Sequence, residues 1–334
     1  MTTEKSDSRI QNGARAIVPG MRAGWTSCML TTALKGPRKC RRPVFAELVD
    51  YWSLTKPEIN FLILITTFVG FYLGCNYEGG NFSLLALFNT LSGTLLVASG
   101  TATLNQYIER GFDAKMRRTA HRPAAAGRLA PRRVLTFGIA LSVAGSIYLA
   151  AAVTLLASAL ALLTLLTYLF LYTPLKRRTA WCVLIGAFPG AMPPLIGWSA
   201  ASGRLSTEAW ILYAILFLWQ FPHFMAIAWM YREDYDRAGY RVLPKGNARL
   251  SFVMAETMVP LLALVPVSLL QSPMGNHAVF YGAELFLGLG FAYFGEKFIF
   301  QRSRVAARRL LAASIVYLPA LFALSTVFCR SSKT

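Results

Sequence analysis

Three oxygen-bearing side chains stand at equal spacing in the stretch NQYIERGFDAKMRRTAHRP, which covers residues 105–123. Asn105, Glu109 and Asp113 are each four residues apart. Four residues turn a helix by only about 40° beyond a full circle, so all three groups line one face. Hard oxygen ligands suit Mg²⁺, which usually keeps some water and bridges to substrate phosphates. The spacing therefore predicts a Mg²⁺ site with Asn105, Glu109 and Asp113 as metal ligands and catalytic residues.

Basic residues follow the acids directly. Lys115, Arg117, Arg118 and Arg122 carry the charges that bind diphosphate oxygens. The arginines alone have a commoner explanation, a cytoplasmic loop that obeys the positive-inside rule. Acidic residues contribute little to topology, so the acidic triplet favours a Mg²⁺-diphosphate site at a membrane surface.

Long apolar runs must position these groups. The chain has 334 residues, of which 55% are hydrophobic, and several apolar runs reach about 20 residues, the length that crosses a bilayer. We expect an all-α, polytopic membrane protein with nine transmembrane helices. The expected spans are residues 59–75, 83–107, 134–152, 155–173, 182–201, 208–230, 252–270, 278–298 and 310–328.

The basic residues indicate the orientation of these spans. With the N-terminus in the cytoplasm, all of the 34 Lys+Arg except Arg204, Arg330 and Lys333 fall on the cytoplasmic side. A formal charge of +19 in this pattern points to topology and anionic lipid, not to nucleic acid. The loops 109–133 and 231–250 then face the same side and can meet over one cavity.

The two ends of the chain differ in character. Residues 1–50 are polar and basic, without the apolar core and cleavage site of a signal peptide, and we expect a disordered cytoplasmic tail. Residues 51–330 form the expected transmembrane domain. The five cysteines are scattered without a CxxC pair, which argues against a disulfide framework or a zinc site.

A second charged cluster follows the sixth span, in WQFPHFMAIAWMYREDYDRAGYRVLPK at residues 219–245. Asp234 is a candidate catalytic residue, as a second contact to metal or diphosphate. Tyr231, Arg232 and Tyr235 are candidates for substrate binding. Arg237 and Lys245 add further cations for phosphate. A solvated loop whose acids neutralise neighbouring bases is the alternative.

Three residues at the ends of spans or inside them complete the candidate set. His223 lies inside the sixth span, where an ionisable residue is a functional hypothesis by default. It would ligate iron, carry a proton, or bond a neighbouring carbonyl, and the last is the commoner fate. Lys176 ends the fourth span and can reach the same cavity. Lys56 precedes Pro57, which suits a helix start, and is a further candidate for substrate binding.

These motifs resemble a known family. The string Asn105–Pro123 is similar to the Asn-x-x-x-Asp/Glu-x-x-x-Asp motif of the UbiA superfamily of intramembrane prenyltransferases. Its continuation resembles the protohaem IX farnesyltransferases (haem O synthases) within that superfamily. Further matches to these enzymes are LTKP (54–57), YTPLKR (172–177), WQFPHF (219–224), YREDYxxAG (231–239) and SIVYLP (314–319).

The resemblance implies a UbiA-type fold of nine helices around a central cavity. It implies farnesyl diphosphate and haem B as substrates, Mg²⁺ as cofactor and haem O as product, for assembly of haem-copper oxidases. It also implies haem A synthase or oxidase assembly factors as partners. The implied location is the cell inner (plasma) membrane, with the mitochondrial inner membrane as the alternative.

Two rival functions are distinguished by the residue types at particular positions. A UbiA-type enzyme for a quinone precursor would carry acids at positions 231 and 235, where this chain has Tyr231 and Tyr235. A non-catalytic haem-handling or transport protein would place its charges inside the spans and would not need an ordered acidic triplet.

Overall fold

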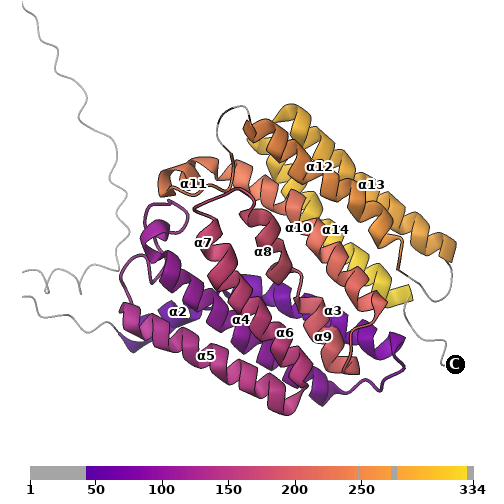
Figure 1. Ribbon diagram of the computed structural model, residues 1–334, viewed down its shortest axis with the longest axis horizontal. Helices are drawn as coiled ribbons and strands as arrows, with labels where there is room; N and C mark the ends of the chain where they lie inside the picture. Colours follow the sequence, from indigo (N-terminus) through magenta and orange to yellow (C-terminus); the bar gives the residue numbers. More distant parts are fainter. Residues whose placement is uncertain (1–42, 245, 247, 272–276, 329–334) are drawn as a thin grey trace, which may run out of the picture. The chain divides into compact units, whose positions relative to one another are not determined.

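The computed structural model describes residues 43–244, 246, 248–271 and 277–328 of the chain. Within these residues, nine helical spans are long and apolar enough to cross a membrane, which confirms the predicted number. A short helix, α2, precedes them, and another, α11, follows the sixth span (Figure 1). The elements are α2 (Val44–Leu54), α3 (Pro57–Tyr77), α4 (Leu84–Asp113), α5 (Pro131–Ala152), α6 (Leu155–Leu166), η1 (Thr167–Tyr172), α7 (Thr173–Leu175), α8 (Cys182–Gly190), α9 (Pro193–Ser202), α10 (Thr207–Met230), α11 (Arg232–Ala238), α12 (Ala248–Ser268), α13 (His277–Gln301) and α14 (Arg304–Phe328).

Large apolar side chains cover the outward faces of the spans. Leu85 and Phe88 on α4, Ile147 on α5 and Phe286 on α13 are each more than 60% exposed. Such faces would be unstable in water, whereas lipid tails solvate them. Many polar side chains of the spans are buried, among them Thr67, Gln220 and Glu284, as expected where no water is available to hydrogen-bond them.

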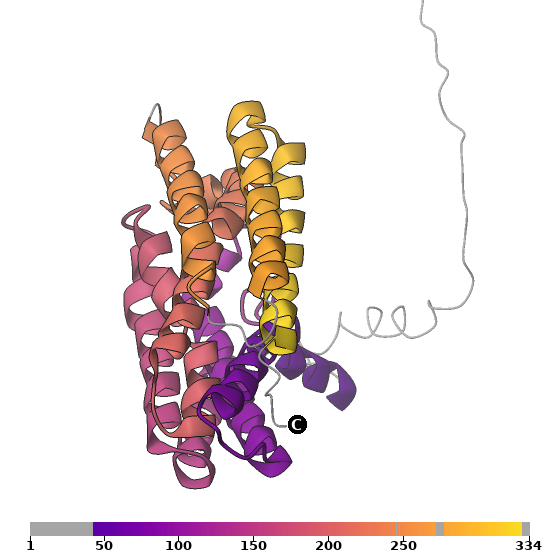
Figure 2. The ribbon, with the colours of Figure 1, turned by 90° about the vertical axis from the view of Figure 1, so that its right-hand side faces the viewer.

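Glycines bring two helix pairs into close contact. α3 packs against α9 and α4 against α5, pairs that also lie together in Figures 1 and 2. A Cβ at Gly70 would lie 2.1 Å from the Pro194 carbonyl oxygen, and one at Gly197 would lie 2.0 Å from the Thr67 carbonyl oxygen. Small residues that let backbones touch are the usual means of helix association in lipid.

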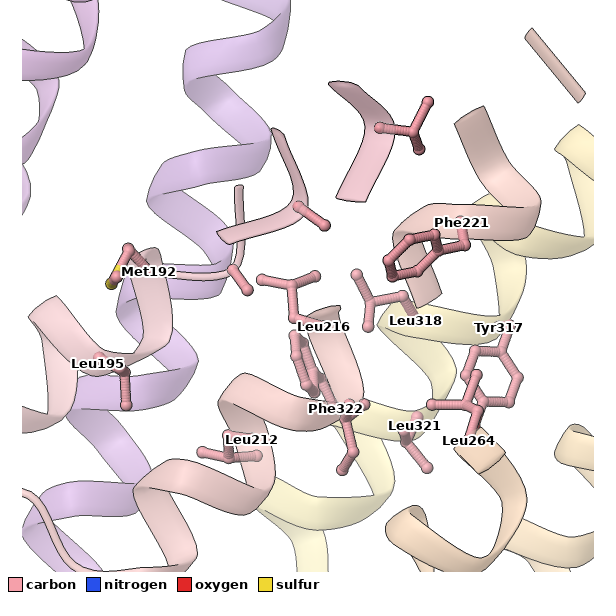
Figure 3. Close-up of a cluster of buried hydrophobic side chains, with 14 of the residues drawn as sticks. Met192, Leu195, Leu212, Leu216, Phe221, Leu264, Tyr317, Leu318, Leu321 and Phe322 are labelled. Carbon is pink, nitrogen blue, oxygen red and sulfur yellow. The ribbon is translucent and has the colours of Figure 1, made fainter. Parts of the chain in front are cut away.

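Much of the buried apolar core is arranged around α10. α10 packs against α8, α9, α12 and α14, so it joins the early spans to the last three. Its Leu212, Leu216 and Phe221 belong to a buried apolar cluster with side chains of α14 (Figure 3). The other labelled members of this cluster are Met192, Leu195, Leu264, Tyr317, Leu318, Leu321 and Phe322.

Two spans are interrupted near the middle of the chain. The fourth changes from α-helix to a π-helical segment at Thr167–Tyr172 before it ends at Leu175. The fifth breaks between α8 and α9, where Pro189, Pro193 and Pro194 remove backbone donors. Neither the π segment nor the position of the break follows from the hydropathy pattern, which registers only length and polarity.

The helix α2 begins inside the segment that we expected to be a disordered tail. Residues 44–50, assigned to the tail, form its first turns, and residues 1–42 lie outside the described part of the chain. Asp50 accepts a bond from Arg128 at 2.8 Å, and Glu47 pairs with Arg133 at 2.5 Å. Leu54 is fully buried. These contacts to the loop before α5 and to the first turn of α5 explain why the helix forms.

Candidate active site

A cavity of about 240 Å³ opens among the ends of α3, α4, η1, α8 and α10. Its walls combine acids, cations, tyrosines and apolar side chains. Eight of the residues predicted from the sequence line it: Lys56, Asn105, Glu109, Asp113, Arg118, Arg122, Lys176 and Tyr235. The structure therefore brings the first charged cluster and part of the second to one place.

The acidic triplet lies on the last turns of α4. The helix runs unbroken to Asp113, so the spacing of four residues places the three groups along one stripe. Asn105, Glu109 and Asp113 are 2%, 6% and 1% exposed. The Asn105 Nδ2 group donates to Glu109 Oε2 at 3.0 Å. The oxygens are thus held inside the protein, away from lipid.

The π segment supplies the wall opposite Glu109. It turns the rings of Tyr168 and Tyr172 toward the cavity, and Thr173 accepts a bond from Asn105 Nδ2 at 3.3 Å. Just after it, Lys176 Nζ donates to both Glu109 carboxylate oxygens, at 3.1 and 3.3 Å. Single π turns inside α-helices are often found at functional sites.

Lys56 enters the cavity from a strained backbone. Its φ of 52° and ψ of 63° are left-handed, at the N-cap of α3. That conformation costs a non-glycine residue roughly 1–2 kcal/mol. It aims the ammonium group at Asn105, whose Oδ1 accepts from Lys56 Nζ at 3.1 Å.

Arg122 closes the cavity at Asp113. Its Nη1 lies 2.9 Å from Asp113 Oδ2, and the two side chains are 21% and 2% exposed. Thr119 donates from Oγ1 to the Asp113 carbonyl at 2.9 Å, which fixes the loop that carries Arg122. Each member of the triplet therefore has a cation against it: Lys56, Lys176 or Arg122.

The charges perturb the groups outside the spans. Burial lowers the pKa of Lys56 to about 7, and the nearby cations Arg122 and Lys176 add to that effect. Burial also opposes the charge on Lys176, but the Glu109 carboxylate beside it raises the pKa of Lys176 well above its usual value. The pKa of Tyr240 is raised by burial and by the same carboxylate.

The donor chemistry of the triplet fits Mg²⁺. Two carboxylates and an amide oxygen are hard ligands, and all three are buried in one cavity. Across the described residues, no cluster of three or more His, Cys, Asp or Glu side chains could hold a metal alone. A complete coordination shell therefore needs oxygens from a substrate diphosphate or from water.

Five of the sequence candidates lie elsewhere. Asp234 is bonded to Arg237 at 3.0 Å on α11, and Arg232 covers the Trp229 ring with its guanidinium. The His223 Nδ1 atom lies 2.8 Å from Ser314 Oγ, and its ring stacks on Trp219. Arg117 is exposed. Tyr231 is not among the cavity-lining residues, and the guanidinium of Arg118 lies over its ring. Lys245 is outside the described residues.

Sequence reasoning missed several residues that line the cavity. Tyr168 and Tyr172 come from the π segment, Gly186 from α8, and Tyr240 and Val242 from the loop after α11. Tyr172 carried a weak signal, because it begins the motif YTPLKR (172–177). Gly186 and Val242 carried none, because a glycine or valine near a span is unremarkable by type.

The comparisons with known proteins decide the family. The model of the "UbiA prenyltransferase family" matches residues 63–325 of the sequence. The chain belongs to the UbiA prenyltransferase family. It is accordingly a membrane enzyme that transfers prenyl groups, and the sequence-based assignment of fold and enzyme class is confirmed.

Similar sequences cover nearly the whole family domain. A protein of Solibacter usitatus is 48% identical over 283 residues, which cover 82% of this chain and 97% of the relative. A protein of Koribacter versatilis is 40% identical over 301 residues, which cover 86% of this chain and 96% of the relative. Both carry the name "Protoheme IX farnesyltransferase".

Solved structures share the fold at low sequence identity. One from a study of digeranylgeranylglyceryl phosphate synthase in membranes gives a TM-score of 0.68 at 16% identity, covering 85% of this chain and 99% of that chain. A UbiA homologue from Archaeoglobus fulgidus, bound to GPP and Mg²⁺, gives a TM-score of 0.57 at 15% identity. The match covers 83% of this chain and 99% of that chain. These likenesses support the nine-helix fold.

Proposed function

We propose that this prenyltransferase moves the farnesyl group of farnesyl diphosphate onto a vinyl group of haem B and, with addition of water, makes haem O. The observation that carries the proposal is the buried cavity in which Glu109 and Asp113 face Lys176 and Arg122. The names of relatives up to 48% identical supply the identity of the two substrates. Tyr231 and Tyr235, where quinone-type relatives would carry acids, also favour a haem-type enzyme.

The diphosphate end of the donor belongs at the charged end of the cavity. Lys56, Lys176, Arg118 and Arg122 can take up charge on the diphosphate oxygens, which increases as the allylic C–O bond breaks. Asn105, Glu109 and Asp113 would hold Mg²⁺ there. When bound, the ion neutralises the leaving diphosphate as a Lewis acid. The carboxylates also keep the cations oriented through the ion pairs described above.

The prenyl chain belongs on the apolar wall of the same cavity. Met116, Val183, Phe224, Ile227 and Ala228 line it beside the charged groups. This wall excludes water from the allylic cation until the acceptor reaches it. The separation of charged and apolar surfaces orients the donor with its diphosphate toward α4.

The acceptor step completes the reaction. The electron pair of the broken C–O bond leaves with diphosphate, and the vinyl π electrons of haem form the new C–C bond to the allylic carbon. The carbocation that results next to the porphyrin ring is captured by water, which loses a proton to give the hydroxyl group. No side chain is assigned to that water.

The enzyme works, in this proposal, at the cytoplasmic side of the cell inner membrane. The excess of Lys and Arg in the tail and in alternate loops supports a cytoplasmic N-terminus. The bacterial relatives support the inner membrane over a mitochondrial one. Haem A synthase and oxidase assembly factors remain predicted partners.

Product analysis tests the proposal. Purified protein in lipid nanodiscs would receive haem B, farnesyl diphosphate and Mg²⁺, and the porphyrins would be identified by mass spectrometry. We expect haem O from the wild type and none above background from Asp113→Asn. Prenylation of a quinone precursor but not of haem by the wild type would refute the acceptor assignment.

A further inference from the structure

A second hollow, of about 410 Å³, lies beside the catalytic cavity. We call it the arginine–tryptophan pocket. Its walls come from the loop before α8, the segment after α11 and the first turns of α12. The lining residues that matter here are Arg178, Trp181, Arg241, Leu243, Pro244 and Phe252.

One segment of chain forms the wall between the two hollows. In residues 240–243 the side chains alternate: Tyr240 and Val242 line the catalytic cavity, whereas Arg241 and Leu243 line the arginine–tryptophan pocket. The Arg241 backbone N–H donates to the Lys176 carbonyl at 2.7 Å. The backbone of residues 240–243 therefore separates a ligand in this pocket from Lys176, whose side chain contacts Glu109.

The pocket combines unpaired positive charge with aromatic side chains. Arg178 and Arg241 are both exposed, and neither has an ion-pair partner among the described residues. Trp181 and Phe252 stand edge to face with centroids 6.0 Å apart. Two guanidinium groups beside aromatic rings suit a planar apolar molecule that carries two carboxylates.

The catalytic cavity by itself is too small for both substrates. Its volume of about 240 Å³ is below the roughly 300–1,000 Å³ of pockets that hold one drug-sized ligand. A prenyl chain and a macrocycle cannot occupy it together. The acceptor must extend beyond it, and the arginine–tryptophan pocket is the adjoining space with matching charge.

We propose that the arginine–tryptophan pocket receives the propionate edge of haem B, with Arg178 and Arg241 binding the two carboxylates and Trp181 and Phe252 contacting the macrocycle. The vinyl edge, on the far side of the ring, then reaches over the 240–243 wall toward the allylic carbon. This inference rests on the proposed function, since it assigns that reaction's acceptor to a place.

Steady-state kinetics of an arginine double variant test the inference. Arg178→Gln/Arg241→Gln should raise the KM for haem B about tenfold, the combined effect expected of two exposed ionic contacts. The KM for farnesyl diphosphate should stay unchanged. Arg132→Gln/Arg308→Gln, which removes two exposed charges elsewhere, is the matched control. An unchanged haem KM in a folded double variant that still makes haem O would overturn the inference and leave the function intact.

Two further arms identify the ligand. Haem B dimethyl ester lacks the propionate charges, so the variant and the wild type should accept it equally poorly. Trp181 fluorescence, taken as the difference from Trp181→Phe, should be quenched by haem B even in Asp113→Asn, which binds acceptor without turnover. If the wild type makes no haem O but haem B still quenches Trp181 fluorescence, the proposed function is wrong and the haem-binding site stands. If the arginine variants affect kinetics only in nanodiscs that contain phosphatidylglycerol, the pocket holds a lipid headgroup, and the inference is wrong.

Discussion

The Lys176 ammonium group bridges both carboxylate oxygens of Glu109, at 3.1 and 3.3 Å, from a position 67 residues further along the chain. The side chains are 15% and 7% exposed, so the pair is largely buried. It joins the end of α4 to the end of the fourth span. A buried pair of this kind is strongly coupled, because either charge alone would lack compensation.

Lys176→Met should both destabilise and inactivate the enzyme. Removing one partner of a buried ion pair costs about 3–5 kcal/mol, seen as a lower thermal midpoint in detergent. The double variant Lys176→Met/Glu109→Gln should recover most of that stability but none of the activity. Equal destabilisation in the single and double variants would show that the two groups are not coupled.

The pH dependence of diphosphate binding should reveal Lys56. Because its pKa in the empty cavity is about 7, the side chain is charged below that pH and neutral above it. An anionic ligand favours the charged form, so binding near pH 8 should take up a proton, and affinity should fall as the pH rises through 7. Calorimetry in buffers of different ionisation enthalpy measures this uptake.

Variants at position 56 separate this lysine from the ligand's own protonation. Lys56→Met should bind more weakly and lose the proton uptake, while Lys56→Arg should keep its charge and its affinity up to higher pH. Uptake that persists in Lys56→Met would assign the proton to another group.

The size of the residue at position 186 should control the prenyl chain. A Cβ there would lie 2.6 Å from the Tyr172 ring, which would move that ring into the cavity. Gly186→Ala should therefore lower turnover with farnesyl diphosphate more than with the shorter geranyl diphosphate. Gly111→Ala, whose Cβ meets nothing within 4 Å, is the control and should gain roughly 0.5–1 kcal/mol of stability. An equal loss of turnover with both donors would show that the prenyl chain does not lie beside Gly186.

Asp234 provides a test of the boundaries of the site. The sequence made it a catalytic candidate, but its carboxylate pairs with Arg237 and is not among the cavity-lining groups. We expect Asp234→Asn to keep turnover within a fewfold of the wild type under conditions where Asp113→Asn is inactive. A loss as large as that of Asp113→Asn would mean that α11 rearranges to bring Asp234 to the substrate.

The sequence predicted those parts of the structure that depend on periodicity and hydropathy. Span lengths and the distribution of Lys and Arg were enough to predict nine membrane-spanning helices. The spacing of Asn105, Glu109 and Asp113 was enough for one helical stripe, because α4 continues through Gly111. These features are local, and a regular helix repeats them without long-range information.

Features that depend on distant contacts could not be predicted. The left-handed backbone of Lys56 directs its side chain to Asn105 on α4, 49 residues away. On the short helix α11, Tyr235 faces the cavity while Asp234, about 100° around the axis, meets Arg237. The acidic residues of this segment have no regular spacing that would show which of them points into the cavity.

Binding of a non-reactive donor analogue tests the central claim most directly. The claim is that Asn105, Glu109 and Asp113 hold a divalent ion against the diphosphate of the donor. We would measure farnesyl thiodiphosphate binding by calorimetry with Mg²⁺ and with EDTA, in the wild type, Asp113→Asn and Asp234→Asn. The account predicts at least tenfold tighter binding with Mg²⁺ in the wild type and Asp234→Asn, and no Mg²⁺ effect in Asp113→Asn. The account would be contradicted if Mg²⁺ left the affinity of the wild type unchanged, or if it still tightened binding in Asp113→Asn.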